Sequence, residues 1–468
     1  MTEQTPSNGP EPTAAPASAP TTTHTAAPTT TPGVAPTPDP TAALGQALAT
    51  RFLRYSAVTS QSDAAATTVP STPGQRELAQ LLAQELQQAG AADVHLSSTA
   101  VLTATVPSTL PPGRTAPVVG LCTHLDTADA GLSPQVRAQV VRYAGGDLPL
   151  GDGARVITLA EHPELGRYTG QPLLVGDGTS VLGADDKAGV AVVMQLACDL
   201  LMADADGGAP PHGELRLAFV PDEEIGLRGV RTMDLARFPV DYAYTIDSCE
   251  VGEVVQETFN AATATLTVTG VSPHPMSAKG VLVNPILVAH ELIGRLDPAQ
   301  TPERTQGREG YIWVNQIRGD QATAVVTLSI RDHDRAGYEA RKELLHQLVA
   351  EVARAHPRAR LELEVEDVYT NLADARTPAN AVALERVYTA LDRLGIRPLP
   401  LAMRGGTDGS WLSAQGIFTP NVFTGAHNFH SWAEFLPLRS FAASYLVVRE
   451  LVRLAAEDGG PAQVGGQH

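Results

Sequence analysis

Two short acidic segments carry the residue types best suited to metal or proton chemistry. The first is LGADDKAGVA, residues 182–191, in which two aspartates lead into an apolar run typical of a buried helix. The second is PDEEIG, residues 221–226, which follows the apolar run 215–220. Because proline cannot donate to a sheet ladder, Pro221 ends this predicted strand. The three acids that follow it therefore lie at the carboxyl end of a strand, the edge where open α/β sheets bind their ligands. Of two neighbouring carboxylates at such an edge, one can bind a cation while the other transfers a proton. Taken alone, however, a run of acids is more often a solvated turn.

Imidazole and carboxylate groups recur where other apolar runs end. One run ends in His124 and Asp126, whose i and i+2 spacing on an extended chain turns both side chains to one face. YAYTID ends in Asp247, and the loop GAHNFHSWAEF carries His427 and His430. Their recurrence is less easily explained by solvated turns. Carboxylates and imidazoles without a thiolate cluster favour a pair of Zn, Co or Mn ions over a structural cysteine-type zinc site.

Composition and motif content exclude several classes of function. The 33 basic and 51 acidic side chains give a net charge of -18, which disfavours binding to nucleic acid or anionic membranes. No stretch approaches the roughly 18–20 consecutive apolar residues of a membrane span. The chain also lacks HExxH, a P-loop, a GxGxxG after a strand and a GxSxG elbow. Cysteine content favours a reducing, cytoplasmic compartment, since only three are present and none is spaced as CxxC.

The 468 residues are long enough for two or three domains. Residues 1–40 are mostly Thr, Pro and Ala, a composition that predicts a disordered leader without the features of a secretory signal. Helices alternate with strands over 41–258 and again over 372–460, which predicts an α/β layered catalytic domain in two parts. Residues 259–371 follow the different order β-α-β-β-α-β, the split unit of a ferredoxin-like α+β domain. We therefore expect this smaller domain to be inserted into the larger one, with a short tail at 461–468.

Eight motifs, in order along essentially the whole chain after the leader, resemble those of the M20 family of metallopeptidases, and within it the tripeptide aminopeptidases. They are HLDT at 124–127, GADDKAG at 183–189, PDEEIG at 221–226, TID at 245–247, HPMSAKG at 274–280, IRDHD at 330–334, RGGTDG at 404–409 and FHSWAEF at 429–435.

The resemblance implies a catalytic domain with two zinc ions and an inserted lid or dimerisation domain. Carried over position by position, His124 and Asp247 would bind one zinc, Glu224 and His430 the other, and Asp185 would bridge both. Cobalt or manganese could replace zinc at these ligands. The implied assembly is a homodimer, and the implied substrate is a small peptide.

The resemblance also implies roles around the metal ions. Asp126 would orient His124, and Glu223 would be the general base that activates a water bridging the two ions, so that the N-terminal residue of a tripeptide is released. His274 matches a lid-domain histidine that stabilises the oxyanion, often from the opposite subunit. Arg331 and Arg404 match positions assigned to substrate binding.

Three residues near these motifs are predicted to have no ligand role: Asp186 is a neighbour of the bridging position, while His427 and His333 fall where the family pattern has an aromatic. The segment around His274 departs from the usual Val-His-Pro-Gly pattern, which leaves the lid contact open. Other amide substrates of the same family, those of dipeptidases, carboxypeptidases or N-acyl amino acid deacylases, are the first alternative. A non-catalytic peptide-binding dimer is a second, although every matched core position holds an acceptable residue.

Overall fold

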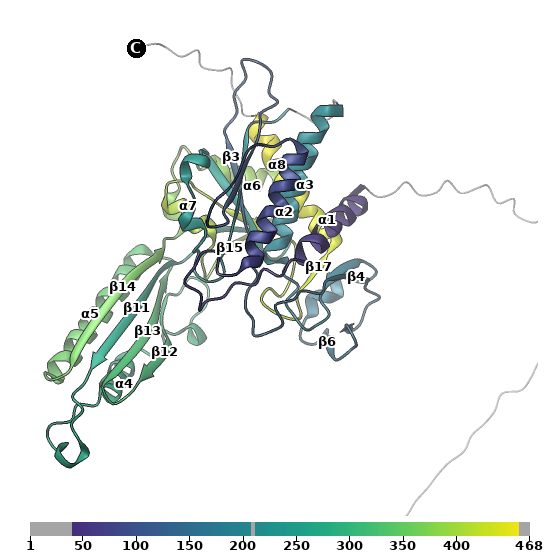
Figure 1. The fold of residues 1–468 in the computed structure, drawn as a ribbon. Helices are drawn as coiled ribbons and strands as arrows, with labels where there is room; N and C mark the ends of the chain where they lie inside the picture. The colour runs from purple at the N-terminus through teal and green to yellow at the C-terminus, as the bar shows by residue number, and fades with distance from the viewer. Residues whose placement is uncertain (1–39, 207–210, 458–468) are drawn as a thin grey trace, which may run out of the picture. The chain divides into compact units, whose positions relative to one another are not determined.

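The computed structural model describes residues 40–206 and 211–457 (Figure 1). The predicted leader, apart from its last residue, and the predicted tail lie outside the described residues. Among the helices in the described part of the chain, none is long and apolar enough to cross a membrane.

The larger sheet has eight strands in the order β1-β2-β8-β3-β9-β16-β10-β15. Neighbours β8, β3, β9 and β16 run parallel, so their carboxyl ends meet at one edge of the sheet. The pairs β1–β2, β2–β8 and β16–β10 are antiparallel, and β10 pairs with β15 in parallel. The strand bounds are β1 Ala92–Leu96, β2 Leu102–Val106, β3 Val119–His124, β8 Leu215–Val220, β9 Tyr242–Ser248, β10 Glu253–Glu257, β15 Leu399–Ala402 and β16 Asn421–Phe423.

Helices cover both faces of this sheet, which explains why its central strands β3, β8 and β9 are buried over nearly their whole length. Most of them pack on one face over the largest core cluster (Figure 1). On the other face, α7 (Asp408–Ala414) contributes Leu412 to a second cluster with Cys122, Ala218 and Ala243. The helices of the first face are α1 Pro40–Ser56, α2 Pro73–Ala89, α3 Ala184–Asp206, α6 Val382–Arg393 and α8 Leu438–Glu457.

A separate antiparallel sheet, in the order β12-β13-β11-β14, carries α4 and α5 and has its own apolar core. Its elements follow the predicted β-α-β-β-α-β order, and the strand order is that of a ferredoxin-like fold. The prediction of a mixed α/β chain with an inserted α+β unit is thus confirmed. The bounds are β11 Asn260–Thr269, α4 Pro285–Arg295, β12 Tyr311–Gly319, β13 Thr323–Asp332, α5 Arg335–Ala355 and β14 Arg360–Tyr369.

Two small sheets, for which no elements were predicted, are built from the strands between β3 and α3 in the sequence together with β17 near the C-terminal end of the described chain. One has the order β17-β7-β4 and brings the C-terminal strand β17 onto β7; the other pairs β5 with β6. Ala433 and Phe435 join the core of this region, and Trp432 packs against it. The small sheets therefore support the C-terminal loop that carries His430. Their bounds are β4 Gln139–Arg142, β5 Leu148–Leu150, β6 Arg155–Ile157, β7 Pro172–Val175 and β17 Phe435–Pro437.

Candidate metal centre

The five predicted ligands gather at the carboxyl edge of the parallel strands. His124 is the last residue of β3, and Asp247 is the second-to-last residue of β9. Glu224 follows β8 in the PDEEIG turn, while Asp185 lies in the first turn of α3, where the backbone is not yet helical. His430 comes from the loop before β17, in the left-handed backbone region with φ 58°. Segments far apart in the sequence are thus joined at one edge.

The carboxylate of Asp185 lies between the two imidazoles. Its Oδ1 is 2.8 Å from His124 Nε2, and its Oδ2 is 2.9 Å from His430 Nε2. Asp247 Oδ1 lies 3.9 Å from His124 Nε2, and Glu224 Oε1 lies 2.9 Å from His430 Nε2. Two groups of three side chains that could hold a metal ion therefore share Asp185, with ligand atoms within 4.8 Å of one another in each group.

The electrostatics of the cluster fit a bound cation. Burial raises the pKa of Asp247 to about 7 and also raises the pKa values of Glu223 and Glu224. Burial acts in the same direction on Asp185, but hydrogen bonds with His124 and His430 hold its pKa below the ordinary value. Glu224 Oε1 is buried and has no well-aligned hydrogen bond to any residue that the structure describes. Buried carboxylates that lack enough donors, together with imidazoles, are the oxygen and nitrogen set that divalent transition metals take.

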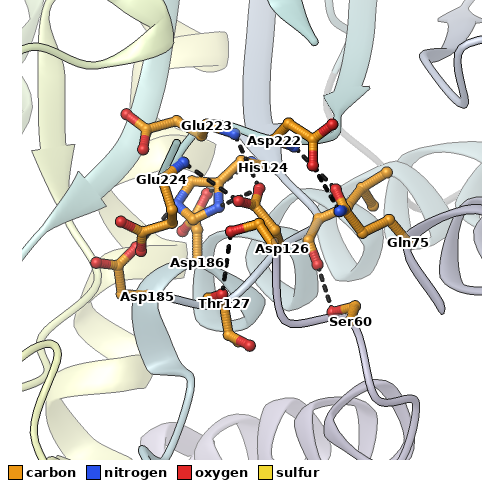
Figure 2. A network of polar contacts seen from close by, with 12 residues as sticks. Ser60, Gln75, His124, Asp126, Thr127, Asp185, Asp186, Asp222, Glu223 and Glu224 are labelled. Carbon is orange, nitrogen blue, oxygen red and sulfur yellow. Dashed lines mark hydrogen bonds and ion pairs between the residues drawn. The ribbon is translucent and has the colours of Figure 1, made fainter. Parts of the chain in front are cut away.

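Asp126 holds two parts of the cluster at once (Figure 2). It is fully buried, and its Oδ1 lies 3.4 Å from His124 Nδ1. The same carboxylate accepts the backbone N–H groups of Glu223, at 3.0 Å, and Glu224, at 3.2 Å. Asp126 therefore fixes the backbone of the PDEEIG turn and lies beside the imidazole of His124; the contact to the turn is not visible in the sequence.

A buried polar network holds the other side of this turn (Figure 2). Asp222, the first acid of the triplet, has φ 57° and no exposed surface. Its carboxylate accepts from the Ser71 N–H at 2.7 Å, the Ser71 hydroxyl at 2.5 Å and Gln75 Nε2 at 2.7 Å. Its own N–H donates to Gln75 Oε1 at 2.8 Å. Left-handed backbone at a non-glycine residue persists only where its surroundings enforce it, and this network does so. No spacing signal points to Gln75.

Lys187 and Glu434 are buried within the quoted motifs but were not predicted to take part. Lys187 Nζ donates to the Ser60 hydroxyl at 2.8 Å, and that hydroxyl donates to the carbonyl of Leu125 at 2.7 Å. Burial lowers the pKa of Lys187 to about 8. Glu434 accepts backbone N–H groups at the entry to α3. Their positions inside GADDKAG and FHSWAEF are the only sequence signal for either residue.

The predicted substrate residues make their hydrogen bonds outside the ligand cluster. His274 is exposed, and its Nδ1 accepts the N–H of Met276. Arg331 donates to the carbonyls of Ala262 and Ile330, at 2.9 Å each. Arg404 donates to a loop of the inserted unit, at Thr305 Oγ1 and the carbonyls of Gly307 and Glu309, and lies over the rings of Phe259 and Tyr311. Their substrate roles stay predictions.

The three residues predicted to have no ligand role fall outside the ligand groups found in the described chain. His427 Nε2 is 2.7 Å from the hydroxyl of Tyr168, and burial lowers its pKa to about 4. His333 Nε2 lies 3.0 Å from the carbonyl of Met403. Asp186 accepts the backbone N–H of His124 at 3.2 Å. Each thus has a structural partner of its own.

The Gln75 network predicts a measurable stability difference. Gln75→Ala leaves the N–H of Asp222 and part of its carboxylate unpaired in a buried site, so we expect a loss of about 1–3 kcal/mol in the free energy of unfolding. Gln84→Ala is the matched control, because Gln84 is exposed on the same helix. Urea unfolding of both metal-free variants measures the difference. Equal stability of the two variants would contradict a structural role for the network.

Comparisons with known proteins agree with this site. The family model "Peptidase family M20/M25/M40" matches residues 182–454. A peptidase T-like protein of Yersinia pestis is 49% identical over 418 residues, which cover 89% of this chain and all of the relative. Peptidase T of Brevibacillus brevis is 40% identical, covering 86% of this chain and 97% of the relative. The solved structure of aminopeptidase PepT from Bacillus cereus has a TM-score of 0.67 at 20% identity, covering 88% and 99% of the two chains, and supports the fold. The chain thus belongs to peptidase family M20/M25/M40, and it is a metallopeptidase.

Proposed function

We propose that this metallopeptidase is an aminopeptidase that releases the N-terminal residue of tripeptides. The observation that carries the proposal is the Asp185 carboxylate placed between His124 and His430, with Glu224 and Asp247 completing the two groups. Support for the peptide substrate comes from relatives named peptidase T, at 38–40% identity over most of the chain.

The same geometry supports a site for two metal ions, for which we propose zinc, with cobalt or manganese as substitutes. His124 and Asp247 would hold one ion, Glu224 and His430 the other, and Asp185 both. When bound, the ions polarise the peptide carbonyl and lower the pKa of a coordinated water. Asp126, on the Nδ1 side of His124, keeps the Nε2 atom directed at Asp185 and Asp247.

Glu223 is the proposed general base. It belongs to a third group of neighbouring side chains with His124 and Glu224, within 4.8 Å. Burial raises its pKa, which suits a carboxylate that must accept a proton from water and hold it until the leaving amine takes it. The two backbone N–H bonds from the turn to Asp126 keep this side chain at the edge of the cluster.

The domain assignment remains part of this proposal. Residues 41–258 and 372–460 would form the catalytic domain, and 259–371 the lid or dimerisation domain. Separate apolar cores in the two sheets support the division.

The decisive activity test uses free tripeptides with products identified by mass. Chelation should abolish release of the N-terminal residue, and added zinc, cobalt or manganese should restore it.

Glu223→Gln should lower kcat by about 10²- to 10⁴-fold, because the proton acceptor is lost, while metal content stays near that of the wild type. Near-normal turnover of this variant would contradict the assigned base. Cleavage of dipeptides or N-acyl amino acids, without tripeptide cleavage, would contradict the proposed substrate class but remain consistent with the proposed metal site.

We also propose that the protein assembles as a homodimer through the inserted unit. Exposed large apolar side chains gather on and beside α4 and β12, and β12 is an edge strand open to pairing. These side chains are Met276, Val281, Leu282, Ile286, Leu287, Trp313 and Ile317.

Leu287→Asp tests the proposed dimer, since it places a charge on an exposed apolar residue of α4. We expect the wild-type mass in light scattering to be twice that of the chain and the mass of the variant to fall toward one chain. Met202→Asp is the control: Met202 is also exposed, but it lies on α3. A wild-type protein of single-chain mass at micromolar concentration would refute the dimer.

A further inference from the structure

The carboxylate of Glu434 accepts the backbone N–H groups of four consecutive residues at the entry to α3. Its Oε2 accepts from Leu182 at 2.8 Å and Gly183 at 2.9 Å. Its Oε1 accepts from Ala184 at 2.7 Å and Asp185 at 3.3 Å. The side chain is 1% exposed, so water does not compete for these donors. One side chain thus satisfies four backbone groups that would otherwise be buried without partners.

Glu434 also belongs to the loop that supplies His430. The backbone groups of His427 and Phe435 bond to each other in both directions, at 2.9 and 3.2 Å, and close this loop. His430 lies within it in the left-handed region, with φ 58°, a conformation that persists at a non-glycine residue only with support from its surroundings. The hydrogen bonds of Glu434 therefore join the backbone around Asp185 to the loop that carries His430.

From these contacts we propose that Glu434 is a positioning residue, which couples the shared ligand Asp185 to the loop of His430 and thereby supports metal capture. The inference rests on the proposed metal site, because it assigns Glu434 a role through two of its ligands. Asp185 Oδ2 and His430 Nε2 lie 2.9 Å apart across the cluster. Loss of the Glu434 contact would free Asp185 and His430 to move independently.

The contact requires a carboxylate rather than an amide. Four N–H groups converge on the two oxygens, so both oxygens must accept. In Glu434→Gln, the amide NH₂ would face two of the backbone donors without an acceptor between them. The substitution keeps the size of the side chain and breaks half of the bonds.

The rest of the loop has anchors that do not depend on Glu434. Phe435, Leu436 and Pro437 pair with β7, and Phe435 and Ala433 are buried in the core of the small-sheet region. Asn428 Nδ2 donates to Glu164 Oε1 and to the carbonyl of Ala433. A Glu434 variant should therefore keep its fold, with the change confined to the contact with residues 182–185.

The experiment measures zinc affinity by competition with a chromophoric chelator, using full-length wild type, Glu434→Gln and Glu434→Asp. We expect Glu434→Gln to bind zinc about 10- to 100-fold more weakly, as is typical when a group that orients metal ligands is changed. Glu434→Asp keeps both oxygens on a shorter side chain and should fall between the two. Tripeptidase activity of Glu434→Gln should rise toward the wild-type value as zinc is added, whereas that of Glu223→Gln should not.

Glu85→Gln is the matched control, since Glu85 on α2 is a partly buried carboxylate that accepts hydrogen bonds from Arg51 and Tyr55. It should lose stability but keep zinc affinity. Equal zinc affinity of wild type and Glu434→Gln would overturn the inference while leaving the proposed function intact. A wild-type protein that binds no divalent metal would instead refute the proposed function.

If Glu434→Gln does not fold, a measurement on the wild type tests whether the contact of Glu434 with residues 182–185 is coupled to metal binding. Because coupling is reciprocal, zinc should slow hydrogen exchange of the amides at 182–185. Unchanged exchange at these four amides in the zinc-saturated wild type would overturn the inference.

Discussion

The shared carboxylate of Asp185 is the contact on which the rest of the site depends. It faces an imidazole from β3 on one side and an imidazole from the C-terminal loop on the other, at 2.8 and 2.9 Å. Buried carboxylates repel one another unless positive charge lies between them. Asp247 belongs with Asp185 to the group of His124, and Glu224 belongs with Asp185 to the group of His430, so that each group could share a cation between two carboxylates. Metal binding and the geometry of three chain segments are thereby linked.

A second set of acids holds the loops that carry the ligands. Asp126 binds the backbone of the PDEEIG turn, Asp222 ties that turn to α2, Asp186 binds the backbone of His124, and Glu434 binds the entry to α3. Each uses its carboxylate oxygens on N–H donors. The high proportion of acids in these motifs therefore has two causes: some can bind the metal, and the others fix the backbone. Such outer contacts orient ligands and tune their affinity for the ion.

The loop RGGTDG contacts both the inserted unit and the segment that connects this unit to the larger sheet. Arg404 binds residues 305–309 of the inserted unit, and the carbonyl of Gly405 accepts the N–H of Phe259, where the chain leaves the larger sheet. The ring of Tyr369 lies so close to Gly406 that a Cβ there would be 2.5 Å away. Glycine at this position thus allows Tyr369, at the end of β14 where the chain leaves the inserted unit, to pack against the loop. A change in Arg404 would therefore affect the junction of the two units as well as any substrate contact.

The sequence by itself predicted the alternation of helices and strands and the inserted β-α-β-β-α-β unit, because apolar periodicity is a local feature. The five residues that cluster as candidate ligands were predicted from eight motifs whose order resembles that of a known family. The sequence could not assign all three acids of the PDEEIG turn: Asp222 turns inward at φ 57° to Gln75, which is 147 positions away. Nor could it predict the contact from Glu434 to residues about 250 positions earlier. These pairings were decided by the tertiary structure, because a buried carboxylate must find donors, and only the packed chain determines which donors lie within reach.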